Sequence, residues 1–285
     1  MSRHPTVLSA DPAAPFPPVE QALRHPDGLL AVGGDLSPPR LLAAYRHGIF
    51  PWYSQGQPIL WWSPDPRTLF RTDAVHLSTR LRRSLRASDW LVCADTAFDA
   101  VVAACASSPR PGQHGTWILP EMRQAYARLH RLGHAHSVEV LDDDGELAGG
   151  IYGVAVGRMF FGESMFSARP GGSKLALAAL ARRLHHWGWP LIDAQVDNPH
   201  LRSLGAQSWP RRQFLEQVQA LVDQPGREGS WREAFGVQPV AALAGAAVLL
   251  AIVLVLSTLL ARRLGFNVED EITIVFCGSK KTLAS

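Results

Sequence analysis

Two carboxylates and an amide, groups that can bind a ligand by charge and by hydrogen bonds, stand at the ends of two apolar, strand-like runs. Glu163 follows one run, and Asp193 and Gln195 lie about thirty residues later at the end of another, with a helix expected over residues 173–187 between them. A strand, a crossover helix and a second strand usually form a parallel pair, so both strands should end at the same edge of one sheet. We therefore predict that the three side chains converge at this edge, where open α/β sheets usually bind ligands.

The elements around this pair predict an α+β fold in two parts. Ser37 and two following prolines are typical of a helix start, and Gly48 of its end. Further helices are expected over 80–86, 98–106, 121–132 and 212–222, and a meander of strands over 135–141, 146–156 and 158–163. We predict a small N-terminal domain over residues 1–65, a second domain over 66–236 and a separate C-terminal segment over 237–285.

The composition is that of a globular protein with a basic surface. The chain has 285 residues, 47% of them hydrophobic, and a pI near 9.0, which permits a polyanionic partner without requiring one. Six arginines form clusters: Arg80, Arg82, Arg83, Arg86, Arg211 and Arg212. On a helix Arg82, Arg83 and Arg86 share one face, which suits a phosphate track and equally suits an ordinary solvated face.

Neither metal nor disulfide chemistry is indicated. The three cysteines are too few and too scattered for a disulfide framework or a structural zinc site, which fits a reducing cytoplasm. Four paired histidines lack further ligands and are expected in the core or on the surface: His134, His136, His185 and His186. No signal for export and no phosphate-binding glycine fingerprint is present, so no cofactor is predicted.

Seven sequence blocks resemble, in order, those of the leucyl/phenylalanyl-tRNA–protein transferase family. They include Gly-Ile-Phe-Pro-Trp at 48–52, Ser-Pro-Asp-Pro-Arg at 63–67, Gly-Thr-Trp-Ile at 115–118, Gly-Glu-Ser-Met-Phe-Ser at 162–167 and Ser-Leu-Gly-Ala at 203–206, and the resemblance extends over about residues 16–235. It implies a GNAT-like acyltransferase domain. It also implies a cytoplasmic enzyme that transfers leucine or phenylalanine from leucyl-tRNA or phenylalanyl-tRNA to proteins with N-terminal Arg or Lys, which makes an N-degron.

The resemblance also implies roles for the three polar side chains. Asp193 and Gln195 match the Asp-X-Gln motif of the family, and Glu163 matches its Gly-Glu-Ser-Met motif. We expect Asp193 to bind the acceptor amine, as a base or as an electrostatic anchor, and Gln195 to orient the ester carbonyl or the amine. Glu163 is expected to recognise a cationic or amino group.

The donor side of the site is expected to be aromatic and apolar. Trp52 and Trp117 match family tryptophans that line an adenosine pocket, and Met165 matches a methionine of the amino-acid pocket. Two apolar departures, Ile151 where a methionine can occur and Leu180 where an aromatic residue can occur, affect the preference between leucine and phenylalanine. The clustered arginines become candidates for binding tRNA phosphates.

Two other functions fit parts of the sequence. An acyl-CoA-dependent GNAT-type acyltransferase would share the fold class, but the aromatic blocks around Trp52 and Trp117 disfavour it. A catalytically silent tRNA-binding module would need the arginines and tryptophans, but it would not need Glu163, Asp193 and Gln195 together.

The C-terminal segment predicts a membrane span. Residues 240–261 carry no charge over 22 residues, enough to cross a hydrocarbon core of about 30 Å as a helix. The residues that follow resemble a short internal piece of the bile acid:sodium symporter family. One span cannot form an alternating-access pathway, so the segment is interpreted as a membrane anchor, an incomplete gene fusion or a chimera.

Overall fold

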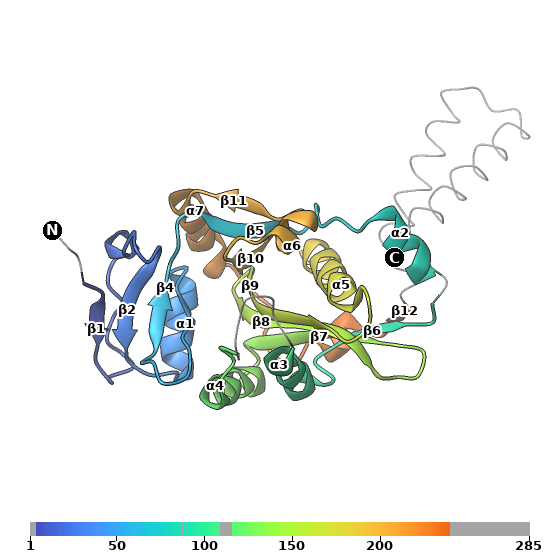
Figure 1. Ribbon diagram of the computed structural model, residues 1–285, viewed down its shortest axis with the longest axis horizontal. Helices are drawn as coiled ribbons and strands as arrows, with labels where there is room; N and C mark the ends of the chain where they lie inside the picture. Colours follow the sequence, from blue (N-terminus) through green and yellow to red (C-terminus); the bar gives the residue numbers. More distant parts are fainter. Residues whose placement is uncertain (1–3, 87, 109–115, 240–285) are drawn as a thin grey trace, which may run out of the picture.

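The computed structural model of the protein describes residues 4–86, 88–108 and 116–239 (Figure 1). Within these ranges the strands form a four-stranded sheet, in the order β1-β2-β4-β3, and an eight-stranded sheet, in the order β11-β5-β10-β9-β8-β7-β6-β12. The smaller sheet lies at the N-terminal end of the molecule, beside the larger one (Figure 1). The predicted α+β class is confirmed.

The small sheet is built from the first part of the chain together with one helix. Its strands are β1 (Thr6–Leu8), β2 (Leu29–Gly33), β3 (Phe50–Pro51) and β4 (Leu60–Trp62), and a short 3-10 turn occupies Val19–Gln21. The predicted helix is α1 (Pro38–Arg46), which has proline in its first turn, and Gly48 has the positive φ of 68° that favours glycine after a helix end.

The remaining elements belong to the large sheet and its helices, and the helices and strands predicted between residues 80 and 222 are all present. In chain order they are β5 (Arg67–Arg71), α2 (Thr79–Arg86), β6 (Leu91–Ala94), α3 (Phe98–Ser107), α4 (Pro120–Arg131), β7 (Ala135–Leu141), β8 (Leu147–Val156), β9 (Met159–Ser167), α5 (Gly172–His186), β10 (Leu191–Gln195), α6 (Pro199–Ser203), β11 (Gln207–Trp209), α7 (Arg211–Val222), α8 (Arg232–Phe235) and β12 (Gln238–Pro239).

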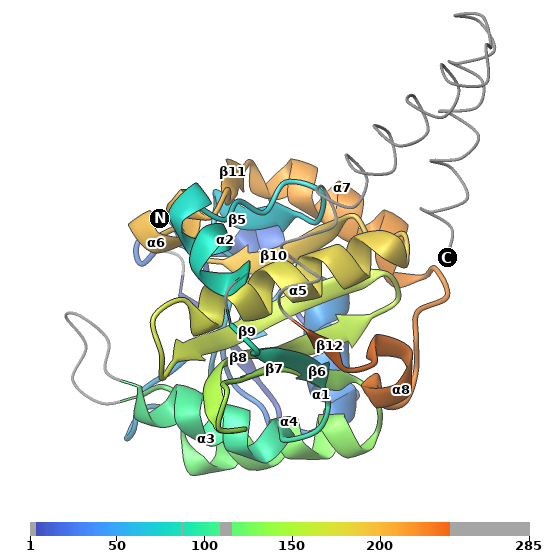
Figure 2. The same ribbon diagram turned by 90° about the vertical axis from the view of Figure 1, so that its right-hand side faces the viewer.

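Two consecutive glycines of β8 show how helices cover both faces of the large sheet. A Cβ on Gly149 would clash with the backbone of Gly172 at the start of α5, whereas a Cβ on Gly150 would lie 3.2 Å from Val101 of α3. Because successive residues of a strand point to opposite faces, α5 and α3 lie on opposite sides of the sheet. Figures 1 and 2 show α5 on one side and the pair α3 and α4 on the other.

Two hydrophobic clusters fill these layers. One contains Trp61 of the small sheet together with Tyr126 of α4, so the small sheet and the α3–α4 face share a continuous core. The other lies under α5 and contains Leu180 and Trp231. Trp231 and Phe235 are each 1% exposed, so the packed core extends to α8. The domain limits at 65 and 236 stay predictions.

The pair β9 and β10 is parallel, as predicted, and it separates early. Its paired residues are Ile192 with Phe160 and Asp193 with Phe161, although β9 continues to Ser167. Beyond Asp193, β10 also departs from regular pairing with β5, and Gln195 adopts a left-handed φ of 63°. Without pairing to hold them together, the two strand ends leave room for a pocket.

The predicted membrane span over residues 240–261 lies outside the described residues. Over the ranges that the structure does describe, no helix combines the length and the apolar character needed to cross a membrane.

Candidate active site

A pocket of about 940 Å³ opens where β9 and β10 separate. Seven residues predicted for the site line it: Trp52, Trp117, Ile151, Glu163, Met165, Asp193 and Gln195. The remaining walls come from β3, from α5 through Leu177, and from the segment 196–201 that joins β10 to α6. The predicted convergence of Glu163, Asp193 and Gln195 is therefore confirmed.

Glu163 is held at the pocket wall by three neutral hydrogen-bond donors. The hydroxyl of Tyr45 and the amide Nε2 of Gln195 donate to Oε1 at 2.8 and 2.9 Å, and the hydroxyl of Tyr126 donates to Oε2 at 2.6 Å. The two tyrosine hydroxyls also lie 2.8 Å apart. Burial and the charge of Glu163 raise the pKa of both tyrosines well above the ordinary value, so both remain protonated donors.

The Glu163 carboxyl is poised to exchange a proton near neutral pH. Burial raises its pKa to about 7, and the negative charge of Asp193 adds to the increase, while the three donors oppose it. A carboxyl with such a pKa is populated in both protonation states under physiological conditions. A side chain that acts as a general acid or base must be able to change its protonation state near the working pH.

Asp193 is paired with a buried arginine. Nε and Nη2 of Arg67 donate to its two carboxylate oxygens at 2.8 and 2.6 Å, and the Asp193 and Arg67 side chains are 1% and 0% exposed. The Arg67 guanidinium also donates to the Gly48 carbonyl at 3.1 Å and lies over the rings of Phe50 and Phe214. Such a bidentate pair fixes the geometry of the Asp193 carboxylate.

Gln195 connects the two carboxylates. Its backbone N–H donates to Oδ1 of Asp193 at 2.9 Å, and its side-chain amide donates to Glu163. The left-handed φ of 63° is uncommon for a residue other than glycine, and such positions cluster at functional sites. This backbone conformation directs the Gln195 side chain toward Glu163 while its own amide stays bonded to Asp193.

The predicted donor side of the pocket is aromatic and apolar, with one difference. Trp52, Trp117 and Met165 are half-buried at its wall, and Ile151 is buried there. Leu180 is fully buried in the core under α5 and is not among the described residues that line the pocket. Leu177, one helical turn earlier on α5, lines the pocket instead.

The predicted phosphate-binding arginines have different surroundings. Arg80, Arg82 and Arg83 are exposed on α2, while the side chain of Arg86 lies outside the described part. Arg211 donates to the carbonyl of Ser63 at 2.5 Å and is thereby tied to the small sheet. Arg212 is exposed and paired with Glu216 at 3.1 Å along α7.

Sequence reasoning missed three residues that support the carboxylates: Arg67, Tyr45 and Tyr126. Arg67 belongs to one of the sequence blocks given above, but its separation of 126 residues from Asp193 gives no local signal. Tyr45 and Tyr126 lie on the buried faces of α1 and α4, where a tyrosine is most simply explained as core. A buried tyrosine hydroxyl needs a hydrogen-bond partner. This requirement is the signal in the sequence that could have pointed to Tyr45 and Tyr126.

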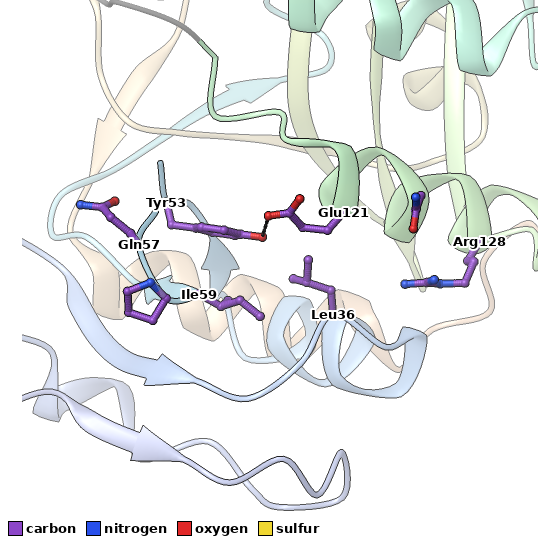
Figure 3. Close-up of a pocket in the computed structure, with 8 residues that line it drawn as sticks. Leu36, Tyr53, Gln57, Ile59, Glu121 and Arg128 are labelled. Atoms are coloured by element: carbon purple, nitrogen blue, oxygen red, sulfur yellow. Dashed lines mark hydrogen bonds between the residues drawn. The ribbon is translucent and has the colours of Figure 1, made fainter. Parts of the chain in front are cut away.

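A second pocket, of about 430 Å³, lies between the small sheet and α4 (Figure 3). Leu36 and Ile59 provide apolar side chains, and Arg128 and Glu121 project from α4 (Figure 3). The hydroxyl of Tyr53 donates to Glu121 across it at 3.2 Å, and burial together with this carboxylate raises the Tyr53 pKa. The residues predicted for the active site line the first pocket and not this one.

Two family models match the transferase part of the chain. The model described as leucyl/phenylalanyl-tRNA protein transferase matches residues 69–219, and the model of the N-terminal domain of the same family matches residues 34–65. A third, the SBF-like CPA transporter family, matches residues 220–285. The described part of this last match, which includes Leu221, Trp231 and Phe235, is packed into the transferase core.

Curated relatives match most of the chain. A leucyl/phenylalanyl-tRNA–protein transferase of Xanthomonas axonopodis pv. citri (strain 306) is 67% identical over 244 residues, which are 85% of this chain and 98% of that protein. The one of Xylella fastidiosa (strain 9a5c) is 62% identical over 84% of this chain and 98% of that protein. A solved structure, that of L-PGS from Bacillus licheniformis, matches at a TM-score of 0.33 with 12% identity over 71% of this chain and 66% of that chain.

The pocket contains the polar and aromatic residues of the matched blocks, and relatives more than 60% identical share nearly their whole length with this chain. The chain therefore belongs to the leucyl/phenylalanyl-tRNA–protein transferase family, which is a family of aminoacyltransferases.

Proposed function

We propose that this enzyme transfers leucine or phenylalanine from the 3′ end of a charged tRNA to the N-terminal Arg or Lys of an acceptor protein, and that Glu163 receives the acceptor amine. The observation that carries the proposal is the buried Glu163 carboxyl, which accepts hydrogen bonds from three neutral donors at the wall of an aromatic pocket. Its burial, which raises the pKa to about 7, supports the same role. With tRNA as the donor, we place the reaction in the cytoplasm.

The chemistry requires only a neutral, well-placed amine, because the amino acid is already activated as an ester of the tRNA. An α-ammonium ordinarily has a pKa of about 7.7–8.0, so a carboxylate with a pKa of about 7 can accept its proton at little cost. The amine nitrogen then attacks the ester carbonyl carbon. As the C–O bond to the ribose breaks, the nitrogen gives up a second proton, the ribose oxygen gains a proton to become a hydroxyl, and the new amide bond remains.

Asp193 acts in this proposal as a positioning residue. Both of its oxygens accept hydrogen bonds from Arg67, and one of them also accepts the Gln195 backbone N–H. Direct binding of an acceptor amine by Asp193 would have to break part of this buried pair, which costs several kcal/mol for a buried ion. The geometry therefore favours Glu163 over Asp193 for the amine, and it assigns Asp193 to the orientation of Gln195.

The donor amino acid and its adenosine fit the opposite wall. Trp52 and Trp117 are half-buried at the pocket, and stacking of a base on an aromatic ring contributes about 1–3 kcal/mol. Met165, Ile151 and Leu177 provide an apolar surface for the leucine or phenylalanine side chain. Flexible methionine can adapt to both side chains.

The order of elements supports a GNAT-like domain. From β6 it runs strand, two helices, three antiparallel strands, crossover helix and a strand parallel to the third, which separates from it at the site. The pocket occupies this separation.

The function is tested by the transfer of labelled leucine from leucyl-tRNA to a peptide that begins with arginine. We expect efficient transfer by the wild-type chain and weaker transfer to a matched peptide that begins with a neutral residue. A Glu163→Gln variant keeps the size of the side chain and removes the base, so it should bind tRNA and transfer poorly. No transfer by a folded wild-type chain that binds leucyl-tRNA would contradict the proposal.

A further inference from the structure

The described residues that line the active-site pocket contain carboxylates but no lysine and no arginine. A phosphate cannot lie deep in such a pocket without an opposite charge, because burying an unpaired ion is costly. If the 3′ adenosine of the donor occupies this pocket, as the proposed function requires, its 5′ phosphate must lie near the mouth. Positive side chains at the mouth are therefore the candidates for binding this phosphate.

Lys174 lies on α5, the helix that borders the pocket through Leu177. It follows Ser173 in the first turn of α5, and Leu177, three residues later on the same helix, lines the pocket. Residues three apart on a helix share a face, so Lys174 lies one turn from the pocket wall, toward the start of α5. Lys174 is half-buried.

His200 belongs to the wall of the pocket itself. It lines the pocket from α6, and the Asn198 side chain fixes the start of this helix by accepting the Leu201 backbone N–H at 2.9 Å. Burial lowers the pKa of His200, and the positive charge of Lys174 lowers it further.

The other charged groups nearby are already engaged. Arg202 of α6 is paired with Asp197 at 3.2 Å. At the start of α5, the backbone N–H of Ser173 donates to Oγ of Ser167 at 2.9 Å, and that of Gly172 donates to the carbonyl of Arg169 at 3.0 Å. Across the described ranges no salt bridge involves Lys174. The side chains of Lys174 and His200, rather than backbone amides, are therefore the groups available to an anion.

We infer that Lys174 and His200 form a phosphate subsite at the mouth of the pocket, and that it binds the 5′ phosphate of the 3′-terminal nucleotide of the donor tRNA. The inference rests on the proposed function and adds a contact to it. A lysine ammonium binds phosphate as a point charge, and a histidine beside it donates a hydrogen bond. Such a contact would fix the nucleotide with its ester toward Glu163.

Two small donors isolate the contact from the rest of the tRNA. One is 3′-O-phenylalanyl-adenosine with a free 5′ hydroxyl, and the other is the same molecule with a 5′ monophosphate; the acceptor is a peptide beginning with arginine. Lys174→Met should reduce kcat/KM for the phosphorylated donor by about tenfold or more, since a charged hydrogen bond contributes about 1.5–3 kcal/mol. For the unphosphorylated donor, kcat/KM should change less than about twofold, because this donor has no phosphate for Lys174 to contact.

Further variants separate charge from structure. Lys174→Arg should restore most of the preference for the phosphorylated donor, and His200→Gln should reduce it in the same sense as Lys174→Met. Arg123→Met removes one exposed charge from α4, on the opposite face of the sheet, and should leave the preference unchanged. With intact leucyl-tRNA, the affinity of the Lys174→Met variant should also depend less steeply on salt concentration. The difference in slope should correspond to the loss of about one phosphate contact.

Equal losses with both donors, or no loss with either, would overturn the subsite. A wild-type enzyme that transfers from both donors but shows no preference for the phosphate would also overturn it and would leave the proposed function standing. A wild-type enzyme that transfers from neither donor nor from leucyl-tRNA would overturn both.

Discussion

Arg67 and Asp193, which are 126 residues apart in the chain, form a bidentate ion pair that is almost completely buried behind the active-site pocket. Arg67 begins β5, and Asp193 lies near the end of the neighbouring β10. The pair holds the bulged end of β10, where Gln195 turns toward Glu163. An ion pair thus supports the site from behind, while the pocket itself presents Glu163.

Removal of Asp193 should therefore destabilise the protein as well as inactivate it. Asp193→Ala leaves the buried Arg67 charge unpaired, and the free energy of unfolding should fall by about 3–5 kcal/mol. Urea denaturation followed by circular dichroism measures this loss. Glu216→Ala, which breaks the exposed pair with Arg212, is the control and should change stability little. An Asp193→Ala variant as stable as wild type would contradict the structural role given to this pair.

The pH dependence of transfer should report Glu163. Its carboxyl must be ionised to accept a proton, and its pKa is about 7, so kcat/KM should rise with pH through about 7. In Glu163→Gln the rate should fall by about 10²–10⁴-fold, the range that general-base catalysis supplies, and the rise near pH 7 should disappear. The acceptor amine ionises in the same way with wild type and with the variant, so its effect on the two pH profiles serves as the internal reference. A variant that keeps the same rise near pH 7 would show that another group titrates there.

Local sequence patterns predicted the framework of this site because its parts are local. The apolar run, the crossover helix and the second run are continuous in the chain, so the parallel pairing of β9 with β10 and the contact between Glu163 and Gln195 followed from their order. The donors to Glu163 come from α1 and α4, and the partner of Asp193 comes from β5. Long-range packing brings these residues together, and no spacing rule encodes it.

The difference between Leu177 and Leu180 has a similar cause. Both leucines belong to the apolar side of α5, and the helix pattern alone cannot separate a position at the pocket from one beneath it. Both leucines are buried in the same hydrophobic cluster, but Leu177 on the earlier turn of α5 also lines the pocket between β9 and β10, whereas Leu180 contacts only the core.

These two leucines should respond differently to truncation. Leu177→Ala enlarges the amino-acid side of the pocket, so the ratio of kcat/KM for phenylalanyl-tRNA to that for leucyl-tRNA should increase. Leu180→Ala leaves a cavity in the core and should lower the free energy of unfolding by about 2–5 kcal/mol, with little change in this ratio. The ratio is measured with both donors in one reaction, so a partly unfolded sample affects both rates equally. A larger change of the ratio in Leu180→Ala would reverse the assignment.

His136 should disfavour the folded state in mild acid, whereas the raised pKa of Glu163 has the opposite effect. This residue is 1% exposed on β7, its Nδ1 donates to Asp95 at 2.9 Å, and its ring stacks on Trp231 at 3.8 Å between ring centres. Burial lowers its pKa below the ordinary 6.5, even though Asp95 opposes this. The unfolded chain therefore binds a proton more readily, and the stabilising effect, complete above about pH 6.5, is lost as pH falls.

The measurement is urea denaturation of wild type and His136→Phe at pH 7.5 and pH 5.5. The aromatic substitution keeps the stack on Trp231 and removes the titratable group, so the stability of wild type relative to the variant should be lower at pH 5.5 than at pH 7.5. Asp95 stabilises the fold above its ordinary pKa of 3.8 and loses this effect only at lower pH, outside this window. Glu163 titrates within the window, but it does so in both proteins and its effect cancels in the comparison. The same change of stability in the two proteins would exclude His136 as a source.

The end of the functional enzyme should lie shortly after α8. Trp231 and Phe235 are buried, and the Trp231 backbone N–H donates to Asp95 at 2.7 Å, so a chain ending at Ser230 should fail to fold stably. A chain ending at Pro239 keeps these contacts and contains both ranges that match the transferase family models, so it should transfer leucine from leucyl-tRNA at the rate of the full chain. Transfer assays and thermal unfolding of the three lengths test both statements. If only the full chain were active, residues 240–285 would take part in folding or in catalysis, and the transporter-like match would not be a separate appendage.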